Sequence, residues 1–188
     1  LVGVRALFLY PLNALINSQR ERLDAWTRGF GTGIRYCLYN GNTENLHASV
    51  KSEQAKRPNE VLSREKMREE PAPILVTNGT MLEYMMVRQV DAPIIQQSKA
   101  QKSLRWIVLD EAHTYVGSQA AELALQLRRV MTAFGMTPDD VRFVATSVTI
   151  AGSDAEKQLK KFLSELSGIP QERIDVLDGS RVIPELEP

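Results

Sequence analysis

The stretch Trp106-Ile107-Val108-Leu109-Asp110-Glu111-Ala112-His113 decides how the rest of the chain is interpreted. Four consecutive apolar residues predict a strand that is buried on both faces of a sheet. Two carboxylates and a histidine follow at once, and open α/β sheets bind their ligands at the carboxyl ends of the strands. The pattern therefore predicts a buried strand with a functional site at its tip. The alternative is a strand that ends in a solvated acidic turn.

Length and composition are those of one globular domain. The chain has 188 residues, of which 43% are hydrophobic and 24% are charged, enough for a domain with its own core. Lys plus Arg and Asp plus Glu both number 23, so the formal net charge is zero. A protein that holds nucleic acid mainly through a basic surface is therefore disfavoured, whereas contacts from backbone amides and helix N-termini stay open.

The single cysteine and the hydropathy pattern indicate the compartment. Cys37 lies in an apolar run and has no second cysteine to pair with, so we expect a buried thiol. No apolar run approaches the roughly 20 residues that span a bilayer, and no signal peptide is visible. We therefore expect a cytoplasmic protein without a membrane partner.

Apolar runs that predict strands alternate with segments of helical periodicity. The predicted strands cover residues 4–10, 34–39, 74–77, 106–109 and 142–147, with a further one at 173–177. The predicted helices cover residues 12–30, 61–68, 81–88, 118–134 and 154–166. Residues 91–103 are interpreted as a polar connection. Strands that alternate with helices predict an α/β fold, a mostly parallel sheet with helices on both faces.

Four stretches in a fixed order resemble the first RecA-like domain of the DEAD/DEAH-box helicases of superfamily 2. They are residues 10–15 with Gln19 (motif Ia), 77–82 (motif Ib), 110–113 (motif II) and 146–150 (motif III). The turn at residues 39–43 also resembles a glycine-bearing turn of these enzymes. The resemblance implies a RecA-like P-loop NTPase fold, incomplete at the N-terminus. Residues 1–150 form part of that domain, and a helix and strand in 151–188 complete or leave it.

The resemblance also implies a nucleotide site for ATP and Mg²⁺. Asp110 would hold Mg²⁺ through water, as hard oxygen ligands do. Glu111 would orient and deprotonate the water that attacks the γ-phosphate. His113 would connect this site to motif III, where Ser147 and Thr149 supply hydroxyls at the nucleotide.

Motifs Ia and Ib imply a nucleic-acid site, with DNA expected rather than RNA. Each motif lies where a strand gives way to a helix, so amides at the helix N-terminus can meet backbone phosphates. The candidate contacts are Pro11, Asn13, Gly41, Thr77, Asn78 and Thr80. Helix capping is the alternative role for the two asparagines.

Four departures from the family pattern qualify the resemblance. The sequence has no Gly-x-x-x-x-Gly-Lys-Ser/Thr loop, which the family places upstream of motif Ia, and no second RecA-like domain with arginine fingers. Val148 replaces the alanine that is usual in motif III, and Asn13 stands where a basic residue is often found. Because the chain begins with Leu1 and its first strand begins at Val4, we expect a fragment of a longer protein.

These observations favour a fragment of an ATP-dependent helicase or translocase, similar to large DNA-repair and phage-defence helicases. Its partners would be nucleic acid and a second RecA-like domain, and the isolated chain is expected to be inactive. The first alternative is a degenerate or split module that binds nucleic acid without ATPase activity. The second, an unrelated metal hydrolase, is disfavoured because two histidines leave no recognisable ligand set.

Overall fold

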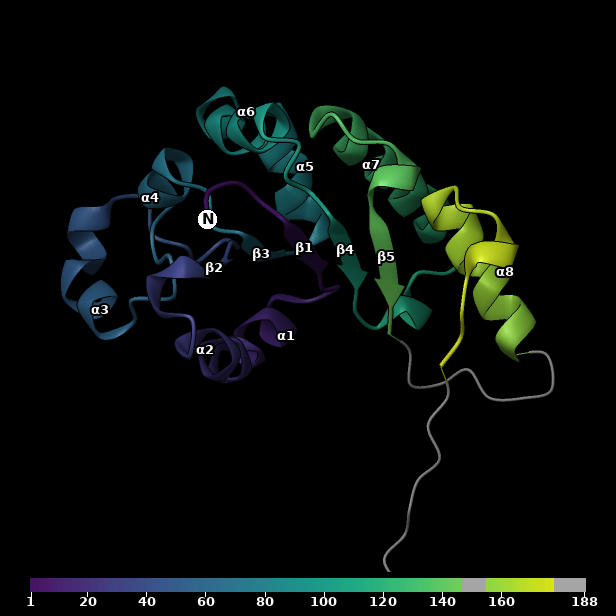
Figure 1. Cartoon of the computed structure of the whole chain (residues 1–188), viewed down its shortest axis with the longest axis horizontal. Coiled ribbons are helices and arrows are strands. Elements are labelled where there is room, and N and C mark those ends of the chain that lie inside the picture. Colours follow the sequence, from purple (N-terminus) through teal and green to yellow (C-terminus); the bar gives the residue numbers. More distant parts are fainter. Residues whose placement is uncertain (147–154, 178–188) are drawn as a thin grey trace, which may run out of the picture.

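Five parallel strands form a single sheet in the order β2-β3-β1-β4-β5 (Figure 1). The computed structural model describes residues 1–146 and 155–177. The strands are β1 (Ala6–Leu9), β2 (Tyr36–Leu38), β3 (Ile74–Thr77), β4 (Trp106–Leu109) and β5 (Arg142–Ala145). Each neighbouring pair in this order is parallel. The predicted fold class is therefore confirmed.

Helices cover both faces of the sheet, as the alternating sequence pattern predicts. They are α1 (Asn13–Ser18), α2 (Arg20–Arg28), α3 (Lys51–Lys56), α4 (Arg64–Glu69), α5 (Gly79–Val87), α6 (Ala92–Ala100), α7 (Ser118–Ala133) and α8 (Ala155–Ser167). Figure 1 shows α5, α6 and α7 on one side of the sheet and α1 and α2 on the other.

The core divides into two clusters because consecutive strand residues point to opposite faces. Leu7 and Leu9 of β1 belong to the larger cluster, together with Ile107 and Leu109 of β4 and side chains of α5, α6 and α7. Val76 and the partly buried Phe8 belong to the smaller cluster, with residues of α1 and α2. The sheet is thus packed on both faces at β1 and β3.

The prediction that residues 106–109 are buried on both faces is wrong at Trp106. This side chain is 39% exposed, and Val144 of β5, which points to the same face from its position opposite Val108, is 37% exposed. These side chains are exposed because the two helices on their face of the sheet lie over other strands: α1 packs against β3 and α2 packs against β2. No described helix covers that face at β4 and β5. The Trp106 ring instead lies under the Arg142 guanidinium, 5.3 Å from the ring centroid.

Three other predicted elements differ from the structure. The helix predicted at residues 12–30 is divided at Gln19 into α1 and α2. The connection predicted at 91–103 contains α6, which buries few side chains, among them Ile94 and Ser98, so its apolar period is weak. The strand predicted at 173–177 is wrong, because the 3₁₀ turn η6 ends at Arg173 and irregular backbone follows.

Within the described residues, no helix combines the length and the apolar character that crossing a bilayer requires.

The outer edge of β5 predicts a pattern of amide exchange. The amides of Arg142 and Thr146 donate to carbonyls of the β4 segment, at 2.8 and 2.9 Å. In a parallel ladder alternate residues face the same neighbour, so the Phe143 and Ala145 amides point to the open edge. Hydrogen exchange should therefore be fast at Phe143 and Ala145 and slow at Val144. Equal protection of all three in a monomer would contradict an open edge.

Candidate nucleotide and nucleic-acid site

The backbone at the tip of β4 turns sharply and presents two carboxylates. The Asp110 amide donates to the Leu9 carbonyl at 3.0 Å and so continues the pairing of β4 with β1. Glu111 then adopts a left-handed conformation, with φ 51° and ψ 43°. The hydroxyl and the amide of Thr114 both donate to the Glu111 carbonyl, at 2.8 and 2.9 Å. Unusual backbone of this kind is concentrated at functional sites.

Thr146 joins this turn to the end of β5. Its hydroxyl donates to the Asp110 carboxylate, and its carbonyl accepts from the Ala112 amide at 2.8 Å. The sequence interpretation missed Thr146 as a site residue, although it opens the motif III stretch. The sequence did contain a signal for it. The residues that directly follow two neighbouring parallel strands lie close together, and Asp110 and Thr146 each follow such a strand. Ser147 and Thr149, the predicted hydroxyl donors, lie outside the described residues.

His113 lies beside Glu111 in the structure. Its Nδ1 is 3.4 Å from Glu111 Oε2, both side chains are half-buried, and the pair lacks hydrogen-bond alignment. The predicted connection from His113 to motif III involves residues 147–150, outside the described part of the chain. Asp110, Glu111 and His113 thus lie on one short turn, where they share a single edge of the sheet.

Two tyrosines flank Asp110. Burial, and then the negative charge of Asp110, raise the pKa of Tyr10 to about 12. The same two causes, in the same order, raise the pKa of Tyr115. Both phenols are therefore protonated at neutral pH, and their hydroxyls stay neutral next to the carboxylate.

The chemistry of this turn fits a magnesium ion that accompanies a nucleotide. Asp110 Oδ1 accepts from Thr146, and Oδ2 takes no hydrogen bond from a described residue. Mg²⁺ is commonly held by one or two carboxylates together with water and substrate phosphates. No three His, Cys, Asp or Glu side chains of the described residues are grouped so as to hold a metal by themselves.

A cleft of about 610 Å³ lies next to this turn, between α1, α5 and α7. We call it the α1–α5–α7 cleft. It is lined by the start of α1, the start of α5, the residues after η4 (Ala112–Thr114) and the N-terminal half of α7. Four of the predicted nucleic-acid contacts line it: Pro11, Asn13, Asn78 and Thr80. The structure therefore brings motifs Ia and Ib to one hollow.

A pair of asparagines joins motif Ia to motif Ib at this cleft. Asn78 Nδ2 donates to Asn13 Oδ1 at 2.6 Å, while Asn78 Oδ1 accepts from the Met81 amide at 2.8 Å. Asn78 is therefore the N-cap of α5, the alternative role considered for it. Asn13 is the first residue of α1, whose N-cap position is Leu12, and no side chain caps that helix.

The other two candidate contacts lie elsewhere. Thr77 has no exposed surface, and its hydroxyl donates to the Tyr39 carbonyl at 2.7 Å. Its interpretation as a nucleic-acid contact is therefore corrected to a structural role, the joining of β3 to the end of β2. Gly41 is exposed in the turn after β2 and does not line the α1–α5–α7 cleft.

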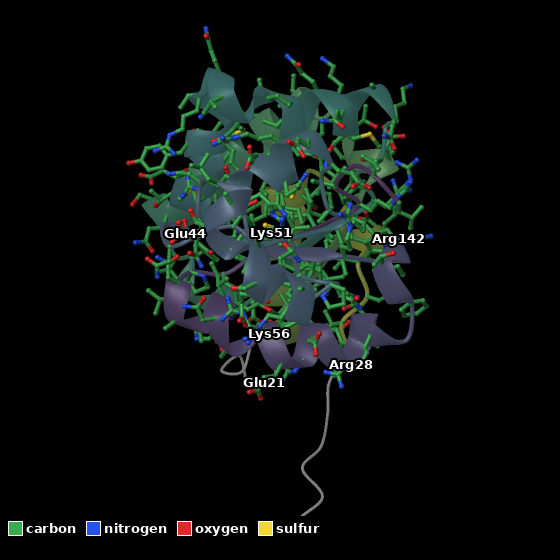
Figure 2. The ribbon with its side chains drawn as sticks, turned by 90° about the vertical axis from the view of Figure 1, so that its left-hand side faces the viewer. Glu21, Arg28, Glu44, Lys51, Lys56 and Arg142 are labelled. Carbon is green, nitrogen blue, oxygen red and sulfur yellow. The ribbon has the colours of Figure 1, made fainter. Side chains whose placement is uncertain are left out.

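Charges on the surface of α2 and α3 have both signs. Figure 2 shows Glu21, Arg28, Glu44, Lys51 and Lys56 on the side of the molecule that these helices occupy. Acidic and basic side chains are interspersed there. The described surface thus offers no single-sign field on this side to attract a polyanion.

A parallel sheet with a carboxylate pair at an inner strand tip, beside a polar cleft, defines the RecA-like class of helicase domain. Comparison with protein families matches residues 1–158 to the DEAD/DEAH box helicases. The chain belongs to this family. The resemblance seen in the sequence is therefore confirmed.

Two curated relatives match most of the chain. Druantia protein DruE of Escherichia coli (strain UMEA 4076-1) is 26% identical over 175 residues, which is 90% of this chain and 9% of that protein. The uncharacterized ATP-dependent helicase YprA of Bacillus subtilis (strain 168) is 28% identical over 174 residues, 91% of this chain and 19% of that protein. The chain thus spans less than a fifth of either relative.

Solved structures of the DUF1998 helicase MrfA share the fold. One superposes with a TM-score of 0.62 and 26% identity, covering 89% of this chain and 22% of that one. The structure of MrfA bound to DNA and AMPPNP gives a TM-score of 0.58 and 25% identity, covering 89% of this chain and 20% of that one.

The position of the Tyr10 phenol beside Asp110 predicts that this phenol loses its proton only at alkaline pH, and that the stability of the fold changes there. Because the folded-state pKa of Tyr10 is raised to about 12, above the value of about 10 for an unfolded tyrosine, this residue stabilises the fold below pH 10. That contribution is lost as the pH rises from 10 through 12. Asp110→Asn should lower the Tyr10 pKa without returning it to 10, since burial is the larger cause.

Phenolate absorbance, with Tyr10→Phe used to subtract the other tyrosines, measures this shift. A Tyr10 titration that is identical with and without the Asp110 charge would contradict the geometry.

Proposed function

We propose that the protein containing this chain is an ATP-dependent helicase or translocase acting on DNA, and that residues 1–150 belong to its first motor domain. Residues 151–188 would complete or leave that domain. The observation that carries the proposal is the turn at the tip of β4, where Asp110 and Glu111 are presented together and Thr146 holds Asp110 from the neighbouring strand.

Phosphoryl transfer needs positioning and charge stabilisation more than covalent chemistry. Glu111 is the proposed base, because its carboxylate leaves the sheet edge where a water can approach a nucleotide. Asp110 is the proposed metal ligand, and Mg²⁺, when bound, neutralises phosphate charge. The hydrogen bond from the Thr146 hydroxyl to Oδ1 restricts the rotation of the Asp110 carboxylate. The other oxygen, Oδ2, is therefore held in one orientation.

The same bonds supply a route for coupling. Asp110 and Ala112 both bond to Thr146, the residue from which motif III begins. A displacement of the β4 turn on hydrolysis therefore displaces the start of motif III. In this proposal His113 links the nucleotide site to motif III, where Ser147 and Thr149 supply hydroxyls at the nucleotide.

The nucleic-acid strand is proposed to cross the rim of the α1–α5–α7 cleft. Asn13, Asn78 and Thr80 lie there with the first turns of α1 and α5, so amide groups can meet the backbone of the strand. DNA is favoured over RNA because MrfA, a similar structure, is bound to DNA. Pro11 shapes the rim, and Gly41 belongs to a separate turn that would contact a longer strand.

A nucleic-acid-binding module without ATPase activity is the second candidate. It is supported by the α1–α5–α7 cleft, whose lining includes Asn13, Asn78 and Thr80 and neither Asp110 nor Glu111. By either proposal the isolated chain should hydrolyse ATP slowly or not at all.

Glu111→Gln tests the catalytic assignment in the longer protein. The substitution keeps the size of the side chain and removes the base, so kcat should fall at least about 100-fold while nucleotide binding survives. Glu21→Gln is the matched control, since Glu21 is an exposed carboxylate of α2 and its loss should leave kcat unchanged. Near-normal turnover in Glu111→Gln would sink the assignment, whereas a longer protein that shows no turnover even with Glu111 in place would favour the module without ATPase activity.

Asn13→Ala and Asn78→Ser test the rim contacts. Serine is also a good N-cap, so Asn78→Ser keeps the cap of α5 and removes the amide. Both variants should weaken single-stranded DNA binding by the same factor for every sequence, because backbone contacts carry no sequence information. Fluorescence anisotropy measures the affinity and thermal melting checks the fold. Selective loss of one sequence would show that these residues contact bases.

A further inference from the structure

The walls of the α1–α5–α7 cleft have the wrong charge for a phosphate. Its lining includes two carboxylates, Glu83 and Glu122, and none of the described residues that line it is basic. Arg129 neutralises Glu83 from outside the lining, with Nη1 2.8 Å from Oε1. A phosphodiester inside the cleft would therefore lie near an uncompensated carboxylate of Glu122. The strand backbone is confined to the rim.

The α7 side of the cleft instead has the chemistry of a base site. Apart from Glu122, the polar residues that line this side are neutral: Thr114 and Tyr115 before α7, and Gln119 and Gln126 on the helix. A cavity of about 610 Å³ is within the range of about 300–1,000 Å³ that small-molecule sites occupy. Neutral hydrogen-bonding groups in a hollow of this size suit a planar, uncharged ligand.

An aromatic ring and an apolar residue give such a ligand surfaces for stacking. Tyr115 is half-buried, and Leu12 is 63% exposed at the start of α1. Both line the cleft. Single-stranded nucleic acid is commonly held by bases that leave their stack and lie on aromatic side chains. This surface is therefore suited to one unstacked base.

Gln126 is fixed in a position that gives the cleft an acceptor. Its Nε2 donates to the Gly79 carbonyl at 2.7 Å, and the residue is only 9% exposed. With the nitrogen bound to Gly79, Oε1 is left to accept, and no described residue donates to it. Oε1 would lie 3.2 Å from a Cβ at position 79, so glycine there allows the close approach. Glu122 adds a second acceptor on the same helix.

From these contacts we propose that the α1–α5–α7 cleft receives one unstacked base of the bound strand, and that it prefers a base with an exocyclic amino group to thymine. The two acceptors, Gln126 Oε1 and Glu122, match the two hydrogens of the amino group that adenine, cytosine and guanine carry, whereas an unpaired thymine offers only its single N3–H. The inference rests on the proposed function, because it requires a strand at the rim. It assigns the rim at the first turns of α1 and α5 to the backbone and the α7 side of the cleft to a base.

Three single-stranded oligonucleotides of equal length, about 12 nucleotides, test this with the 188-residue chain. One is oligo-dC, one is oligo-dT, and one has abasic sites with the same phosphate backbone. By fluorescence anisotropy oligo-dC should bind at least about fivefold tighter than the abasic strand, the low end of one base-stacking contact. Oligo-dT should fall between the two.

Two substitutions separate stacking from hydrogen bonding. Tyr115→Ala should lower the affinities for oligo-dC and oligo-dT toward the affinity for the abasic strand. Tyr115→Phe keeps the ring and should retain both affinities. Gln126→Met keeps the side-chain length and should remove the preference for dC over dT. Because Gln126 also holds Gly79, Glu122→Ala is the second test of the same preference at an exposed position, where folding is not at stake.

The outcomes distinguish this inference from the proposed function. Binding of all three strands with equal affinity overturns the base site and leaves rim binding of the backbone intact. If oligo-dC and oligo-dT bind equally well, and both bind more tightly than the abasic strand, the base preference is overturned. No binding of any strand to the folded chain overturns nucleic-acid binding by these residues, and the inference falls with it.

Discussion

The register of β1 between β3 and β4 is the constraint on which every candidate residue depends. Leu9 lies opposite both Thr77 and Leu109, so the three strands end at the same level. The residues that follow each strand are polar or helix-forming, and they are therefore delivered to one edge. A shift of one residue in either pairing would turn the side chains of that strand to the opposite face. The apolar alternation of the two clusters prevents such a shift, so core packing and site geometry have a common origin.

Local signals in the sequence were sufficient for the five strands of the sheet and for the position of Asp110 and Glu111 at a strand tip. The runs at residues 74–77 and 106–109 are short, apolar and followed by polar residues, and the structure begins and ends both strands at those bounds. Asp110 and Glu111 were assigned to a strand tip by the same signal. Their roles in catalysis stay predictions.

The interpretation of the sequence failed where a residue's interaction partner is distant along the chain. The acceptor for Thr77 is the Tyr39 carbonyl, 38 residues away, and the partner of Asp110 is Thr146, 36 residues away. Trp106 is exposed because of where α1 and α2 pack, a property of other elements. No local pattern contains these facts, although the strand order would have placed Thr146 beside Asp110.

The left-handed backbone of Glu111 creates a conflict between stability and the proposed chemistry. Glycine would stabilise this backbone conformation, whereas the proposed reaction needs a carboxylate at the same position. A side chain with a Cβ costs about 1–2 kcal/mol in this conformation, and glycine avoids that cost. Glycine at this position would therefore give a more stable chain that has lost its proposed base. A screen for thermostability alone would enrich such a change, and stability gained at the expense of activity is a common result of that kind of selection. Engineering for robustness should leave position 111 unaltered and look for its gains away from the tip of β4.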